Sequence, residues 1–151
     1  MVAFMKIFVD ADACPVKEIL VDVAKERGLE LVFVVSFAGY FDRGWDAQRI
    51  VVDTSPQAVD LAIINRVAAG DLVVTQDYGL ASLVIGKGGL AISPRGKIFH
   101  DGNMDGLLWQ RHIHHEARKA GARVKGPKKR SQEDNARFRE NFLRLLQVYE
   151  R

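Results

Sequence analysis

The stretch KIFVDADACPVKEIL, residues 6–20, decides the fold. An apolar, β-prone run from Ile7 to Val9 ends at two aspartates one residue apart, Asp10 and Asp12, and a helical pattern follows at once. Pro15 suits the first turn of that helix, where a missing N–H leaves no bond unmade. The stretch therefore predicts a strand that leads directly into a helix, and it leaves two negative charges at the strand end to be explained.

The same alternation continues along the chain. Residues 30–36, 49–53 and 71–75 give strand-like runs as continuous as the one at 6–10, with a weaker run at 90–93. Such unbroken Val, Ile, Leu and Phe runs are typical of parallel strands that are covered on both faces. Helical patterns separate them, ending at Gly28, at Gly70 and near residue 85. We therefore predict an α/β fold, with a doubly wound, mainly parallel sheet flanked by helices.

The second half of the chain adds an extended segment and two helices. Residues 37–48 form an aromatic loop, and residues 93–102 predict a turn with a short hairpin or extended piece. One helix is expected over about 103–120, capped by Asn103, and a last helix over about 132–149. Ser131 and Asp134 resemble a capping box at its start. The core-facing stripe of the last helix comprises Phe138, Phe142, Leu145 and Leu146.

Composition and charge bound the function. A chain of 151 residues is one domain by size, and its single cysteine, Cys14, excludes an internal disulfide and suits a reducing cytosol. No apolar run approaches the roughly 20 residues that span a bilayer, so we expect a cytoplasmic protein. Residues 1–117 carry 11 Lys/Arg against 15 Asp/Glu, whereas residues 118–151 carry 11 against 4. The basic end points to phosphate-rich partners, although a solvated helix would also carry such charge.

Three carboxylates are expected to meet at one edge of the sheet. Asp10 and Asp12 end the first strand, and Asp77 follows the fourth in DLVVTQDYGLA. Functional groups gather beyond the carboxyl ends of parallel strands where strand order reverses, so these acids converge if the two strands are neighbours. Clustered like charges call for a cation, and Mg²⁺ prefers oxygen ligands. Asp12 and Asp77 could instead each cap the helix that follows.

Asp60 is the fourth candidate acid. On a helical wheel of about 100° per residue, it points along the face that carries Ile63, Ile64 and Val67. A buried carboxylate is costly without a partner, so a cation or a hydrogen-bonding network is expected around it. A salt bridge or a cap to a neighbouring loop is the simpler alternative.

Three motifs resemble a known family. DADACPVK at 10–17, GDLVVTQDYGLA at 70–81 and GPKKRSQEDNARF at 126–138 closely resemble the YaiI/YqxD family of uncharacterised bacterial proteins, over essentially the whole chain from Met5. That family looks like a relative of PIN-domain nucleases, which have a compact α/β fold whose acidic residues bind Mg²⁺ or Mn²⁺ to cut RNA. The resemblance implies a single PIN-like domain over residues 1–151, with a basic helical extension from about residue 118.

The resemblance also implies roles for single residues. Asp10 and Asp77 match metal ligands, and Asp12 and Asp60 match a second first-strand acid and the helix acid. PIN domains usually draw a glutamate from that helix, so the shorter Asp60 departs from the pattern. We expect a metal-dependent nuclease, acting on RNA rather than DNA, in which Asp10, Asp12, Asp60 and Asp77 are catalytic and Asp10, Asp60 and Asp77 hold Mg²⁺ or Mn²⁺.

Basic residues supply the expected nucleic-acid contacts. Each phosphate that such a side chain neutralises steepens the salt dependence of binding. A solvated linker and a surface lysine are the alternatives. The residues expected to bind nucleic acid are Lys17, Lys125, Lys128, Lys129 and Arg130.

Other features admit simpler readings. Cys14 fits a small packed residue, and the HIHHE run at 112–116 fits surface histidines better than a zinc site. Tyr40 and Trp45 could stack on bases or pack in their loop. Two rival functions remain: a haloacid-dehalogenase-type phosphatase with Asp10 as nucleophile, and a non-catalytic nucleic-acid-binding module with a vestigial acidic pocket. The first is weakened because Asp71 begins its strand, at the opposite end of the sheet from Asp77.

Overall fold

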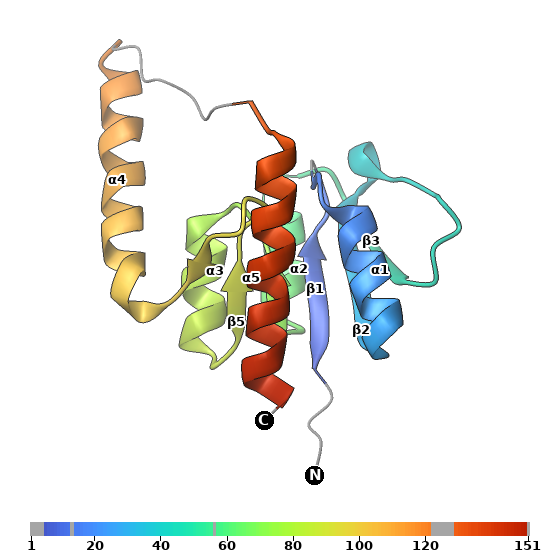
Figure 1. Cartoon of the computed structure of the whole chain (residues 1–151). Helices are drawn as coiled ribbons and strands as arrows, with labels where there is room; N and C mark the ends of the chain where they lie inside the picture. The colour runs from blue at the N-terminus through green and yellow to red at the C-terminus, as the bar shows by residue number, and fades with distance from the viewer. Residues whose placement is uncertain (1–4, 13, 56, 122–128, 151) are drawn as a thin grey trace.

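The protein is built on one six-stranded sheet. A computed structural model describes residues 5–12, 14–55, 57–121 and 129–150 (Figure 1). The strand order is β3-β2-β1-β4-β5-β6, with every pair parallel except β5 and β6. The strands are β1 (Lys6–Asp10), β2 (Glu30–Ser36), β3 (Gln48–Val52), β4 (Leu72–Val74), β5 (Leu90–Ile92) and β6 (Ile98–Phe99). The predicted strands are confirmed, and the short hairpin is β5 with β6.

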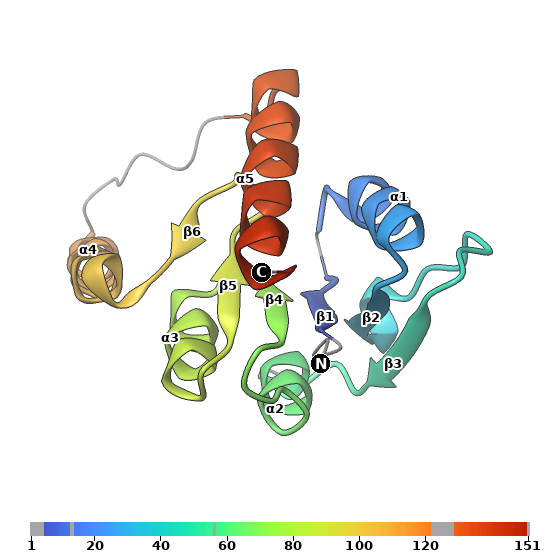
Figure 2. The same ribbon diagram turned by 60° about the horizontal axis from the view of Figure 1, so that its bottom comes forward.

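Helices cover both faces of this sheet, as the prediction of a doubly wound fold requires. Figure 2 shows α1 and α5 on one face and α2 and α3 on the other, with α4 standing outside, beyond α3. The predicted α/β fold, with a mainly parallel sheet flanked by helices, is confirmed. The helices are α1 (Lys17–Arg27), α2 (Ala58–Ile64), α3 (Tyr78–Gly86), α4 (Asp101–Lys119) and α5 (Gln132–Glu150), and a 3-10 turn, η1 (Phe37–Gly39), follows β2. No helix within the described residues is long and apolar enough to cross a membrane.

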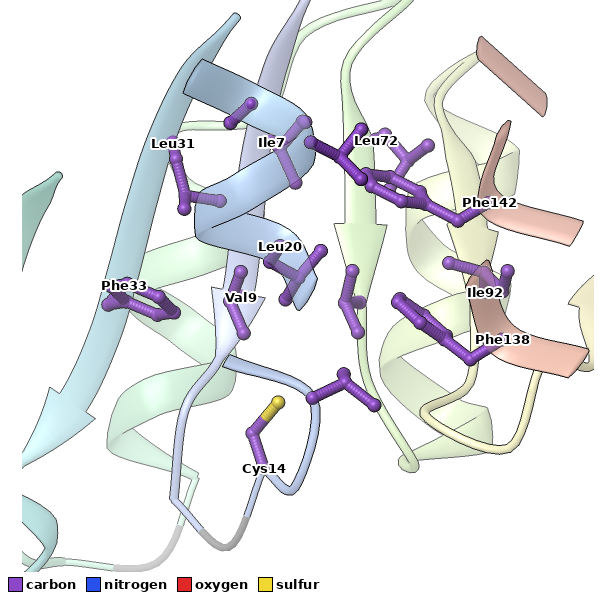
Figure 3. Packing of buried hydrophobic residues seen from close by; sticks show 14 of the residues in the cluster. Ile7, Val9, Cys14, Leu20, Leu31, Phe33, Leu72, Ile92, Phe138 and Phe142 are labelled. Carbon is purple, nitrogen blue, oxygen red and sulfur yellow. The ribbon is translucent and has the colours of Figure 1, made fainter. Parts of the chain in front are cut away.

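The last helix belongs to the core. Phe138 and Phe142 are fully buried, and their rings stack with centroids 5.4 Å apart. Figure 3 shows both rings reaching from α5 toward Leu72 and Ile92 of the sheet. The predicted apolar stripe of α5 is confirmed, and this packing places the first turn of α5 at the edge where β1 ends (Figure 1).

Several helix ends differ from the predictions. Helix α1 begins at Lys17, so Pro15 lies in the turn before it rather than in its first turn. Helix α2 spans only Ala58–Ile64, whereas the predicted helix ended at Gly70. The chain enters the helix through Gln57, which has a left-handed backbone conformation with φ 69°. The N-cap of α4 is His100 rather than Asn103. Asn103 is the third helical residue, and its side-chain oxygen accepts the backbone N–H of His100. The order of elements is unchanged by these shifts.

Candidate functional site

We call the sheet edge that carries Asp10, Asp12 and Asp77 the acidic edge. It lies where the strand order reverses. β1 pairs with β2 on one side and with β4 on the other, so the reversal falls between β1 and β4. Val9 is level with Val74, which puts Asp10 beside Thr75 at the carboxyl end of both strands. The predicted adjacency of the first and fourth strands is confirmed. Crevices at such positions are where open α/β sheets bind ligands.

Asp10 is tied to β4 through Thr75. The Thr75 hydroxyl donates to Asp10 Oδ2 at 2.9 Å and accepts the backbone N–H of Asp77 at 2.9 Å. Burial raises the pKa of the Asp10 carboxyl, against the opposing effect of the Thr75 bond, and the charges of Asp12 and Asp77 raise it further. These three carboxylates therefore act on one another, and the ionised form of Asp10 is disfavoured unless positive charge is brought in.

Asp77 and Asp12 each commit one oxygen to the backbone. Asp77 Oδ1 accepts the N–H of Leu80 at 3.0 Å and so caps α3. Asp12 Oδ1 accepts the N–H of Ser36 at 3.1 Å, so Asp12 fastens the end of β2 rather than capping α1. Both carboxylates are held in fixed positions, and a capping role is compatible with a functional one because a carboxylate has two oxygens.

Asp60 approaches the acidic edge from α2. It is half-buried in the first turn of α2 and lines a hollow of about 290 Å³ that it shares with Asp77. Leu61 and Leu83, both exposed, line the same hollow, and Gln57 with its positive φ stands at its end. The structure thus brings Asp60 to Asp77, across the groove between α2 and α3.

The donor set fits a hard divalent ion bound through few protein ligands. Within the described part of the chain, no three Asp, Glu, His or Cys side chains are arranged to hold an ion by themselves. Mg²⁺ is commonly bound by one or two carboxylates while it keeps several waters, which matches the half-buried Asp10 and Asp77, whose charges repel one another. The ligand set Asp10, Asp60 and Asp77 remains a prediction.

Three of the five predicted basic contacts lie within the described residues. The Lys17 ammonium donates to the carbonyl of Cys14 at 3.0 Å. Arg130 is half-buried at the start of α5, and Lys129 is exposed. Lys125 and Lys128 lie outside the described residues. Whether these side chains bind nucleic acid remains a prediction.

Other candidate residues have structural roles. Cys14 is buried, as predicted, and burial raises the pKa of its thiol. Asp71 accepts the N–H groups of Lys6 and Ala68 at the amino end of β4, far from the acidic edge as predicted, so it gives no support to a phosphatase site. Trp45 packs against Phe33 with ring centroids 6.0 Å apart, as the loop-packing alternative expects, and base stacking by Tyr40 and Trp45 remains a prediction.

Sequence reasoning missed two contributors. Thr75 holds both Asp10 and the backbone of Asp77, and its place between a buried strand and an acidic residue was the available signal. Asn135 accepts two bonds from Arg130, at 2.9 Å from Nε and 2.7 Å from Nη2. Its signal was its position inside the GPKKRSQEDNARF motif, which gave no chemical role by itself.

Fold and site together define a doubly wound α/β protein with a carboxylate cluster at its switch point. The chain belongs to the YaiI/YqxD family: the family model described as "Uncharacterized BCR, YaiI/YqxD family" matches residues 8–148. It is similar to UPF0178 proteins of Exiguobacterium sibiricum, at 46% identity over 142 residues covering 94% of this chain and 96% of that one, and of Clostridium kluyveri, at 42% with 94% and 93% covered.

Among solved structures, the chain is similar to a crystal structure of Rae1 (YacP) from Bacillus subtilis, a W164L mutant. The TM-score is 0.46 at 17% sequence identity, covering 78% of this chain and 84% of that one. This is a partial likeness of backbone architecture.

Proposed function

We propose that this protein is a divalent-metal-dependent nuclease that hydrolyses phosphodiester bonds, with RNA as its substrate. The observation that supports it is the meeting of Asp10, Asp12 and Asp77 at the reversal of strand order, where burial and the two neighbouring charges raise the pKa of Asp10. Carboxylates that repel one another at a ligand-binding crevice are suited to hold a cation and a phosphate together.

The chain's own residues divide the work. Asp10 and Asp77 would hold the ion, each with one oxygen already fixed, by Thr75 and by the Leu80 N–H. Asp60 would complete the site from the shared hollow, and Asp12 would orient incoming water through its second oxygen. Bound there, Mg²⁺ or Mn²⁺ would activate water and stabilise the charge that develops on the leaving oxygen. The reaction needs no nucleophilic side chain.

The experiment is a cleavage assay with matched aspartate variants. Labelled single-stranded RNA, structured RNA and DNA are incubated with Mg²⁺, Mn²⁺ or EDTA. Asp10→Asn and Asp77→Asn should each lower the cleavage rate by more than about 100-fold, since even outer-shell partners of metal sites are worth about 10–100-fold. Asn retains the capacity to cap α3, so Asp77→Asn leaves that helix start intact.

Asp22→Asn is the control, because Asp22 is exposed on α1 and away from the acidic edge, and it should cleave at the wild-type rate. If folded protein leaves every substrate intact with both metals, the nuclease proposal is wrong. RNA binding that persists in that case, and survives Asp10→Asn, would instead identify a binding module with a vestigial acidic pocket.

A further inference from the structure

A second hollow adjoins the acidic edge. It has a volume of about 370 Å³ and lies between the entry to α1, the loop after η1 and the first turn of α5. Three segments far apart in sequence therefore converge on it. The residues that matter for its chemistry are Cys14, Lys17, Phe41, Arg43, Trp45 and Asn135.

Two cationic side chains lie over the aromatic wall of this hollow, which consists of Phe41 and Trp45. Lys17 Nζ lies 4.9 Å from the centroid of the Phe41 ring, and the Arg43 guanidinium carbon lies 5.6 Å from that of Trp45. Cation–π contacts of this kind hold a charge in place without neutralising it. Since cations lie over these two rings, the wall offers positive charge rather than a stacking surface for a base.

A third cation, Arg130, is bound to Asn135, the residue of α5 that lines the hollow. Nε and Nη2 of Arg130 both donate to the amide oxygen of Asn135, which fixes the plane of the guanidinium. The acceptor is neutral, so this bond does not neutralise the guanidinium, although the nearby Asp134 carboxylate offsets part of its charge. Burial lowers the pKa of Arg130, although the group stays charged at any physiological pH, and a partly desolvated guanidinium interacts more strongly with an anion.

The Cys14 thiol interacts electrostatically with Lys17, with Arg130 and with Asp10 of the acidic edge. Burial raises the pKa of the Cys14 thiol, while the charges of Lys17 and Arg130 act to lower it and that of Asp10 acts to raise it. Cys14, which lines the hollow, therefore interacts electrostatically with both cations and with Asp10. The one acid lining the hollow that the structure shows in an ion pair, Glu18, is exposed and pairs with Arg43 at 3.3 Å.

We propose that this hollow is a phosphate subsite. It rests on the proposed function, and it adds that a phosphate group of the bound strand is held by Lys17 and Arg130 while a neighbouring phosphodiester lies at Asp10 and Asp77. Arg43 lies at the rim in its ion pair with Glu18, and Asn135 acts as a positioning residue through Arg130. The phosphate is either internal to the strand or a terminal 5′-phosphate, and both have the chemistry that this set of donors recognises.

Binding measured without cleavage tests the subsite. In an Asp10→Asn background, fluorescence anisotropy gives the affinity for single-stranded RNA, with a 5′-phosphate or a 5′-hydroxyl, at several salt concentrations. Lys17→Met and Arg130→Gln should each reduce the slope of log affinity against log salt by about 0.7, the value for one phosphate on a single strand. Lys25→Met, an exposed lysine in the last turn of the same helix, should leave the slope unchanged.

The position of Asn135 is tested in the same assay. Asn135→Ala should lower the slope in the presence of Arg130 and have no further effect after Arg130→Gln, because it acts only through that arginine. A loss confined to 5′-phosphorylated RNA identifies a terminal phosphate, and an equal loss with both strands identifies an internal one.

The subsite is wrong if Lys17→Met and Lys25→Met change the slope equally. Its failure is distinct from that of the nuclease proposal, which is judged by cleavage with the Asp10 carboxylate intact. Wild-type protein that cleaves RNA while Lys17→Met has no specific effect would overturn the subsite alone. A protein that never cleaves but loses affinity on Lys17→Met would retain the subsite and lose the nuclease.

Discussion

Asp10 is a carboxylate whose charge works against the fold. Its pKa is raised, first by burial and then by Asp12 and Asp77, so the folded protein holds this proton to higher pH than the unfolded chain does. For an acid with a raised folded pKa, stability is lost as pH rises from the unfolded value through the folded one. At neutral pH the Asp10 carboxyl therefore makes the apoprotein less stable than it is at acid pH.

Asp10→Asn should consequently raise the thermal midpoint of the metal-free protein by a few degrees at pH 7. Asn keeps an oxygen that accepts from Thr75 while it removes the charge. The difference from wild type should vanish below the unfolded pKa of aspartate, about pH 3.9, where both chains are neutral at this position. Addition of Mg²⁺ or Mn²⁺ should stabilise wild type more than the variant. Thermal melts at about pH 3 and pH 7 measure this, and a midpoint lowered at pH 7 would contradict it.

At the scale of elements, the turn η1 packs closely against Asp12 of the acidic edge. A Cβ added at Gly39 would overlap the Asp12 carboxylate and would lie 3.3 Å from a Val35 methyl. Because the carboxylate can swing away, the expected cost is its bond to Ser36, about 1 kcal/mol of unfolding free energy. The same movement takes the Asp12 carboxylate away from Asp10.

Gly39→Ala should therefore lower the cleavage rate by more than its loss of stability explains. Gly86→Ala is the matched control, because a Cβ there meets nothing within 4 Å at the end of α3 and a helical alanine is favourable. Chemical denaturation and cleavage rates compare the two. Equal activity in both variants would show that Asp12 has no part in the reaction.

Elements with continuous apolar runs could be predicted from the sequence, and their partners at the site could not. β1 and β2 occupy the expected residues because both faces of each strand are buried. The prediction for helix α2 was too long, because the apolar periodicity continues to Val67 whereas the helix ends at Ile64. The convergence of Asp10 with Asp77 followed from strand order. The bond from Arg130 to Asn135 depends on side-chain rotamers at a helix start, which periodicity does not encode.

At the scale of the molecule, one core joins β1 to α5. Phe138 lies fully buried in the same cluster as Ile7 and Val9, although they are far apart in sequence. Phe138→Ala should reduce the unfolding free energy by about 3–5 kcal/mol, the usual cost of removing a buried aromatic ring. Arg139→Ala, at an exposed position of the same helix, should change it by less than about 0.5 kcal/mol. Urea unfolding measures both, and a small loss for Phe138→Ala would mean that α5 is an appended helix.

This joining of distant segments has a consequence for assembly. The helix that seals the apolar interior also carries Asn135, the hydrogen-bond partner of Arg130 just before the helix, to the edge where β1 ends, so the core and the proposed site are completed by the same docking event. A growing polypeptide in which α5 has not yet emerged holds the acids but lacks their cover and the flanking cations. Competence for the proposed reaction should then arise only once β1 and α5 have met, late in folding.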